Sequence, residues 1–146
     1  MIKMMVHMLG ALPALQVVGA SLLSGVVGTM ILTGFFITIM SVELLAMLLP
    51  VVVAFNAAIS GYMLIDRGGE AIHRPHVISA TVGIGVAMVS FIAINSICFH
   101  MGGFVLMSGT QALVAGGMAV VGAWCAGVLA VKYHQLQEQA AATEQG

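Results

Sequence analysis

Four long apolar stretches, separated by short polar turns, constrain this chain more than any other feature of its sequence. They cover residues 15–40, 44–65, 77–99 and 104–131 of a chain of 146 residues. A helix needs about 20 apolar residues to cross a hydrocarbon core of about 30 Å, and each stretch meets that length. The sequence therefore predicts an all-α integral membrane protein, a four-helix bundle made of two transmembrane hairpins.

The four basic residues orient the predicted bundle. Lys3 precedes the first stretch and Lys132 follows the fourth. Arg67 and Arg74 separate the second stretch from the third. Four spans with both termini inside place all these residues on the cytoplasmic side, as the positive-inside rule requires. We therefore expect a plasma-membrane (inner-membrane) protein whose N- and C-termini are both cytoplasmic.

The predicted spans occupy most of the chain and limit the possible function classes. We expect an interfacial or cytoplasmic lead over residues 1–14, the bundle over 15–132, and a polar cytoplasmic tail over 133–146. A formal net charge of −1 argues against a nucleic-acid partner, which would require a basic surface. The sequence contains no nucleophile motif, phosphate-binding loop or paired carboxylates, so we expect neither enzyme activity nor a cofactor.

Turn residues mark where the spans begin and end. Ser41 followed by Glu43 is typical of a helix N-terminus, and it predicts the turn between the first two spans. The pair at residues 68–69 is Gly-Gly, which predicts the end of the second span, and Pro75 predicts the start of the third. We expect residues 100–103 to form the turn between the last two spans.

The fourth stretch carries a row of small side chains at alternating spacings of three and four residues. Helices in lipid associate through close packing, which small side chains permit. We therefore predict a helix-packing face, against the rest of the bundle or against another subunit. Its members are Gly109, Ala112, Gly116, Ala119, Ala123, Ala126 and Ala130.

Polar residues within or beside the spans are the main candidates for a site, because lipid cannot satisfy their hydrogen bonds. Glu43, Asn95, His100 and Gln111 all fall toward the outer ends of the spans, and we predict that they surround an outer polar vestibule. The alternative is structural: Glu43 then caps the second span, and the two amides hold helices together. Asn56, near the middle of the second span, is predicted to make an interhelical polar contact.

A metal site is a weaker hypothesis. Cys98, His100 and Met101 bring a thiol, an imidazole and a thioether close together in sequence, and soft ligands of this kind suit Cu(I). The alternative is that methionine fills gaps in an apolar core, as it commonly does. A bis-histidine haem needs two inward histidines at one depth, and the sequence offers no such pair near the outer face.

Two main functions remain open. The first is a small polytopic subunit that assembles, anchors or lines a larger membrane complex. The second is a self-oligomerising ion or proton channel, or a small transporter, that uses the outer polar vestibule. A haem- or copper-binding electron-transfer anchor is a third, weaker alternative. In each case the expected partners are bilayer lipids together with other membrane subunits or further copies of the chain.

Overall fold

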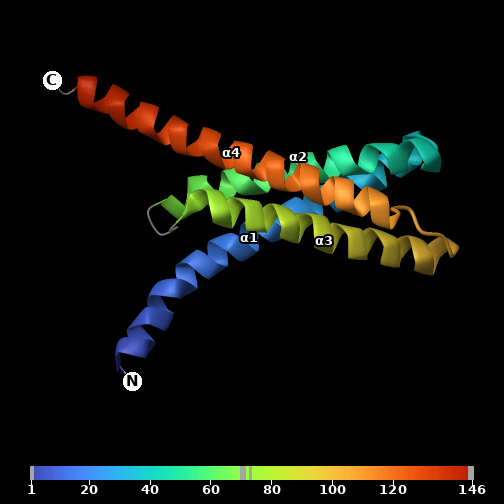
Figure 1. Ribbon diagram of the computed structural model, residues 1–146, viewed down its shortest axis with the longest axis horizontal. Helices are drawn as coiled ribbons and strands as arrows, with labels where there is room; N and C mark the ends of the chain where they lie inside the picture. The colour runs from blue at the N-terminus through green and yellow to red at the C-terminus, as the bar shows by residue number, and fades with distance from the viewer. Residues whose placement is uncertain (1, 70–71, 73, 145–146) are drawn as a thin grey trace.

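The computed structural model is all-helical and contains four long helices among the residues that it describes, which are 2–69, 72 and 74–144. They are α1 (Ile2–Ile39), α2 (Val42–Gly68), α3 (Pro75–Gly102) and α4 (Gly109–Glu144). The helices alternate in direction, so both termini and the α2–α3 connection lie at one end of the bundle (Figure 1). The predicted fold class, an all-α chain with four long apolar helices, is confirmed.

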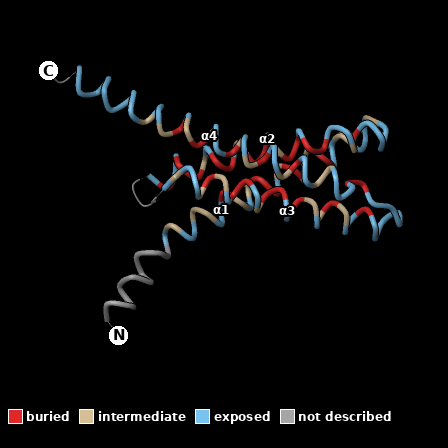
Figure 2. Tube along the Cα trace, in the orientation of Figure 1, coloured by how far each residue is buried: buried red, intermediate tan, exposed pale blue. Residues whose placement is uncertain are grey.

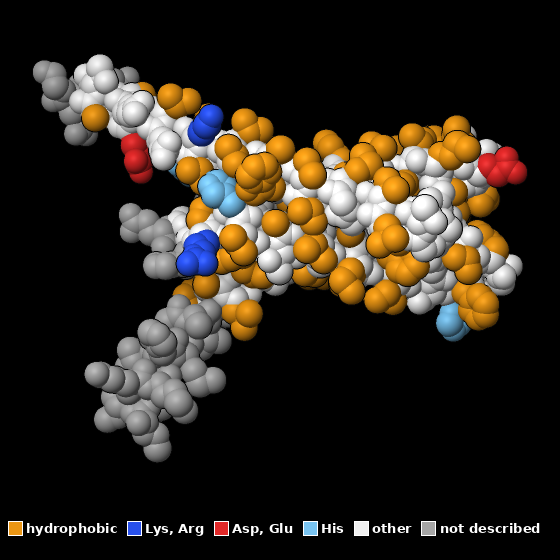
Figure 3. Space-filling view, viewed as in Figure 1, with side chains coloured by type: hydrophobic (Ala, Val, Ile, Leu, Met, Phe, Trp, Pro, Cys, Tyr) orange, Lys and Arg blue, Asp and Glu red, His pale blue; other side chains and the backbone are white. Residues whose placement is uncertain are grey.

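Each helix is long and apolar enough to cross a membrane. The candidate spans are Pro13–Ile39, Val42–Gly68, Pro75–Gly102 and Gly109–Thr143. At a rise of about 1.5 Å per residue, even the shortest of them exceeds a hydrocarbon core of about 30 Å. Apolar side chains cover the middle of the face shown in Figure 3, whereas charged side chains gather at its two ends. This distribution is that of a membrane protein.

The turn between α1 and α2 is built as its sequence predicts. Ser41 is extended, with φ −66° and ψ 151°, and its hydroxyl accepts a hydrogen bond from the Leu44 N–H at 3.4 Å. Glu43 lies in the first turn of α2, where a carboxylate interacts favourably with the helix dipole. Ser41 therefore separates two helices that would otherwise read as one continuous apolar run.

Glycine and proline set the connection between α2 and α3. Gly69 caps the C-terminal end of α2 with φ +46°, a backbone conformation that residues other than glycine rarely adopt. Its N–H donates to the Ile65 carbonyl. Pro75 then occupies the first turn of α3, where its missing N–H has no cost. These local preferences agree with the helix ends predicted at this loop.

The observed helix bounds differ from the predicted ones at both ends of the chain and at the connection between the last two spans. Helix α3 continues to Gly102, so the turn predicted at residues 100–103 is wrong, and the connection lies at residues 103–108. Helix α1 begins at Ile2 and runs through Pro13, so the backbone of the predicted lead is continuous with the first span. Helix α4 begins at Gly109 rather than at residue 104, and it continues to Glu144 through most of the predicted tail. The side chains of residues 1–12, Lys3 among them, and residues 145–146 lie outside the described part of the chain.

The helices do not contribute equally to the interior. Helices α2 and α3 each pack against all the others, whereas α1 and α4 scarcely touch each other. Buried residues therefore concentrate along the middle of the bundle, and α1 and α4 flank it (Figure 2). The largest fully buried side chains include Leu45, Leu49 and Leu64 of α2 and Val82 and Val86 of α3.

Candidate functional site

The Asn95 side chain holds the loop between α3 and α4. Its Oδ1 accepts hydrogen bonds from the N–H groups of Leu106 and Met107 at 3.1 and 3.0 Å. Its Nδ2 donates to the Met107 carbonyl at 2.9 Å. Leu106 and Met107 are buried, so these backbone groups have little access to solvent. The amide of Asn95 thus explains why residues 104–108 form a folded-back loop instead of the first turns of α4.

Gln111 lies in the first turn of α4 and ties this helix to α2. Its Oε1 accepts from the Ser108 N–H at 2.9 Å, and its own N–H lies 3.3 Å from the Ser108 hydroxyl oxygen. This reciprocal pair is a capping box, which satisfies backbone groups that a helix start leaves free. The Gln111 Nε2 also donates to the Ala46 carbonyl of α2 at 3.1 Å. Gln111 is therefore a cap and an interhelical contact at once.

Glu43 and His100, the two titratable members of the predicted vestibule, are exposed. The His100 Nδ1 lies 2.8 Å from the Ser96 carbonyl oxygen of its own helix. Within the described part of the chain, no hydrogen bond or ion pair joins any two of Glu43, Asn95, His100 and Gln111. The side-chain amides of Asn95 and Gln111 thus bond to backbone groups. Neither Glu43 nor His100 forms a hydrogen bond with these amides in the described part of the chain.

The three residues considered for copper have different surroundings. Cys98 is buried, the His100 ring bonds to its own helix, and Met101 is 85% exposed. Among the described residues, no three His, Cys, Asp or Glu side chains come together as a metal site would require. Both cysteines, Cys98 and Cys125, are free thiols.

Asn56 lies where α2 approaches Gly28 of α1, and the interhelical polar contact expected of it stays a prediction. It is buried, and its Nδ2 donates to the Val52 carbonyl of its own helix at 2.9 Å. Its Oδ1 faces Gly28 of α1 so closely that a Cβ at that glycine would collide with it. The Nδ2 donor of Asn56 thus bonds within α2, while its Oδ1 acceptor faces the backbone of α1 at Gly28.

The small residues of α4 permit backbone-to-backbone packing at the centre of the bundle. Ala119 and Ala123 are fully buried. A Cβ at Gly83 of α3 would lie 2.7 Å from the Ala119 carbonyl oxygen, and a Cβ at Gly61 of α2 would lie 2.7 Å from that of Ala123. The Ser79 hydroxyl donates to the Ala123 carbonyl at 2.6 Å. Helix α4 is therefore in close contact with both α2 and α3 here.

The observed packing face is rotated relative to the predicted one. Gly109 and Gly116 have open space where a Cβ would point, and Ala112 and Ala126 are half-buried. Buried small residues that the prediction omitted are Ala115 and Gly127, whereas the predicted member Ala130 is fully buried. The prediction used a heptad, which averages 3.5 residues per turn, whereas an α-helix has 3.6 and drifts from that line by about 20° per heptad. A search at spacings of four residues from Ala115 would have found Gly127.

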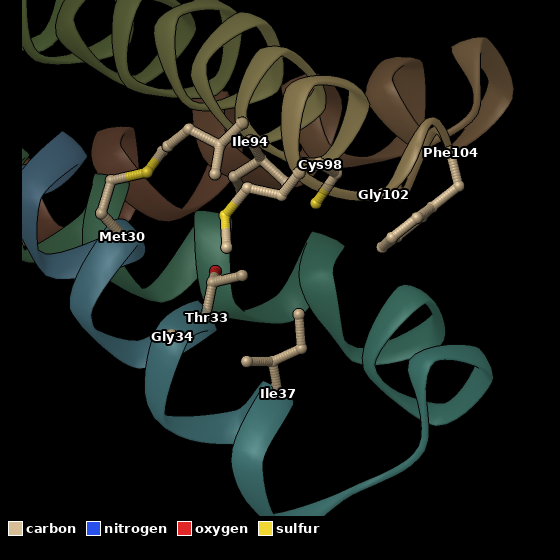
Figure 4. A pocket seen from close by; sticks show the side chains of 10 residues that line it. Met30, Thr33, Gly34, Ile37, Ile94, Cys98, Gly102 and Phe104 are labelled. Carbon is tan, nitrogen blue, oxygen red and sulfur yellow. The ribbon is translucent and has the colours of Figure 1, made fainter.

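Apolar grooves between helices mark the outside of the described part of the bundle. One of about 440 Å³ lies between α1 and α3 near Phe104, and Met30, Thr33 and Cys98 line it (Figure 4). A second, of about 640 Å³, lies between α3 and α4. A third, of about 530 Å³, lies between α2 and α4. The grooves between α4 and its neighbours expose the glycines that face away from the core.

Four buried hydroxyl groups have no hydrogen-bond partner among the described residues. They belong to Ser21, Thr33, Ser60 and Ser90. By contrast, the Thr29 hydroxyl donates to the Gly25 carbonyl one turn earlier at 2.8 Å, as hydroxyls in helices commonly do. An unpartnered buried hydroxyl is costly, so these groups are places where a water molecule would be stabilised.

Comparison of the chain with known protein families, with curated proteins and with solved structures found no match.

Proposed function

We propose that the protein is a small polytopic membrane subunit whose role is assembly within a larger membrane complex. The observation that carries this proposal is the groove of about 640 Å³ between α3 and α4. Gly116 and Gly117 line it, and a Cβ at either position would meet open space. The side chains opposite them, such as Ile84, Met88 and Phe91 of α3, are large and apolar.

The interior of the bundle supports the same proposal. Lipid tails are as apolar as leucine, so helices in a bilayer associate where small residues let backbones approach. Gly61 and Gly83 already serve that purpose inside this chain. Gly116 and Gly117 would let the backbone of a further helix approach α4 from outside, because a Cβ at either position meets no described atom within 4 Å. The occupant that fits this groove is a transmembrane helix of another subunit with a ridge of larger apolar side chains.

In the proposed orientation, the chain spans the plasma (inner) membrane with both termini and the α2–α3 connection on the cytoplasmic side. This orientation rests on Arg67, Arg74 and Lys132, which lie toward the end of the bundle where α2 ends and α3 begins, since His134 of α4 contacts Asp66 there. Labelling of single cysteines tests this orientation. In a chain without its native cysteines, His76→Cys or Val105→Cys introduces one cysteine at an exposed position. Impermeant reagent outside the cell should label position 105 and spare position 76. The opposite pattern would refute the orientation.

The assembly role is tested by filling the α3–α4 groove. Gly116→Leu should reduce the recovery of associated subunits several-fold when the protein is purified in mild detergent, because the new side chain occupies the partner's place. Gly19→Leu is a matched control, since Gly19 of α1 also faces open space but lies outside the groove. Equal recovery with both variants, or a wild-type chain that purifies without other subunits, would contradict the proposal.

A second candidate function is conduction of protons or ions by an oligomer. The buried hydroxyls of Ser21, Ser60 and Ser90 favour it, because they are polar groups without partners on three helices of the interior. If they hold water along a conducting path, Ser60→Ala should lower proton flux in liposomes without reducing helix content. Flux no greater than that of empty liposomes for the wild-type protein would eliminate this candidate.

A further inference from the structure

The groove of about 440 Å³ between α1 and α3 ends at an aromatic ring. Residues between positions 30 and 37 of α1 and between positions 94 and 102 of α3 supply its walls. The Phe104 ring forms one end, and it packs so closely on Gly102 that a Cβ at that glycine would collide with it (Figure 4). A helix lying along the groove would meet this ring, whereas the volume is in the range of small-molecule sites, about 300–1,000 Å³.

Thr33 supplies a polar group to this pocket. Thr33 is only 8% exposed, and its hydroxyl has no hydrogen-bond partner among the described residues. The oxygen points from α1 toward α3, into the pocket (Figure 4). Among the described residues that line the α3–α4 and α2–α4 grooves, none has a polar side chain. The α1–α3 pocket therefore differs from these two grooves in its chemistry.

Other threonines of α1 bond to their own backbone. The Thr29 hydroxyl donates to the Gly25 carbonyl at 2.8 Å, and the Thr38 hydroxyl donates to the Phe35 carbonyl at 2.6 Å. A threonine in a helix divides between two rotamers, because one of them permits this bond. Thr33 makes no such bond, so its hydroxyl is left for a molecule in the pocket.

The pocket needs an occupant with two different parts. A water molecule would satisfy the Thr33 hydroxyl but would leave the apolar walls unfilled. A lipid acyl chain would fill the space but has no group that can bond to the hydroxyl, and an unpartnered buried hydroxyl is costly. A molecule with an apolar body and one hydrogen-bonding oxygen meets both requirements.

We propose that this pocket binds a membrane-dissolved small molecule that has an apolar body and one hydroxyl or carbonyl oxygen. The Thr33 hydroxyl donates to a carbonyl oxygen, or donates to and accepts from a hydroxyl. The apolar walls of α1 and α3 and the Phe104 ring enclose the body of the molecule. The pocket shares no lining residue with the α3–α4 groove, so the inference does not depend on the partner subunit proposed above.

Photolabelling of the full-length chain in phosphatidylcholine vesicles tests the inference. The probes are an eight-carbon alcohol and the corresponding alkane, each with a diazirine, compared at equal concentrations in the bilayer. Mass spectrometry measures the labelling of residues 94–104 relative to Met47, which is exposed near the same end of the bundle. The alcohol should label the pocket about 2- to 10-fold more than the alkane, the effect of one hydrogen bond. Equal labelling by the two probes would overturn the inference and indicate an apolar surface covered by lipid.

Two substitutions separate the role of the hydroxyl from that of the space. Thr33→Val keeps the shape of the side chain and should abolish the preference for the alcohol. Thr38→Val is its control, because that hydroxyl already bonds to a carbonyl and lies outside the pocket. Gly34 lines the pocket and a Cβ there meets open space, so Gly34→Leu should reduce labelling by both probes, whereas Gly19→Leu should not. A preference for the alcohol that persists in Thr33→Val, or labelling that Gly34→Leu leaves unchanged, would refute the site.

Discussion

The two flanks of the bundle pack in different ways. On the α4 flank, Gly61 and Gly83 meet the backbone of α4 at Ala123 and Ala119, so three helices approach at the level of their main chains. On the α1 flank, Gly25 and Gly28 face the polar groups of Ser60 and Asn56, and Gly85 of α3 faces the side chain of Leu22. Small residues on both partners give a tight contact, whereas small residues opposite polar side chains leave unpartnered hydroxyls and a groove.

This contrast predicts where the bundle is sensitive to substitution. On the α4 flank, the atoms facing Gly61 and Gly83 include backbone carbonyl oxygens of α4, which cannot move aside unless the whole helix moves. The α1 flank presents side-chain atoms of Ser60 and Asn56 instead. A substitution at the first flank must separate helices, while one at the second needs only a side-chain adjustment.

Gly83→Leu should be the most damaging change. Its Cβ alone would lie 2.7 Å from the Ala119 carbonyl oxygen, so α3 and α4 must move apart. Overpacking of this kind costs about 3 kcal/mol, the upper end of the usual range. Unfolding in a titration with denaturing detergent, followed by helix content, measures the loss. A cost equal to that of Gly19→Leu, whose site is open, would show that the α4 flank is not tightly packed.

Asn95→Leu should be the next largest. The change leaves the N–H groups of Leu106 and Met107 without the acceptor that now lies 3.1 and 3.0 Å away. Buried backbone donors without a partner cost about 1–3 kcal/mol. Proteolysis of the α3–α4 loop should accelerate, and Asn95→Asp, which keeps the acceptor oxygens, should retain part of the protection. A loop as resistant as that of the wild type would refute the role assigned to Asn95.

Gly25→Ala tests the α1 flank. The added methyl group meets the Ser60 hydroxyl and Val86, both short side chains, and we expect a cost of about 1 kcal/mol. Combining it with Ser60→Gly, which removes the obstructing hydroxyl, should recover part of that stability. Strict additivity of the two changes in a double-mutant cycle would mean that these residues do not interact.

Asp66→Asn should have the smallest effect. The ion pair between Asp66 and His134 is 3.4 Å long, and both side chains are about half exposed. Exposed ion pairs contribute roughly 0.2–1 kcal/mol, and salt screens them. The variant should therefore match the wild-type unfolding midpoint closely, and more so in high salt. A loss comparable to that of Gly83→Leu would mean that the projecting end of α4 is essential to the bundle.

The polar residues show which part of a site can be read from a sequence. Position along a span is a local property of the sequence, and it places Asn95 and Gln111 toward the ends of their helices. Their partners are not local: Asn95 bonds to residues 106 and 107 across a turn, and Gln111 bonds to Ala46, which is 65 residues away. The outer polar vestibule was an inference from shared depth, and shared depth does not show which way a side chain points.

By itself, the sequence determined the number of helices, their apolar character and several of their ends. Burial of unpaired backbone groups in lipid is so costly that long apolar runs must be helical, and Ser41, Gly69 and Pro75 act through their own backbone preferences. Only the tertiary structure decided which face of each helix is covered. The covered face depends on how neighbouring helices cross. In α4, this crossing buries Ala115 and Gly127, whereas Gly116 faces open space outside the bundle.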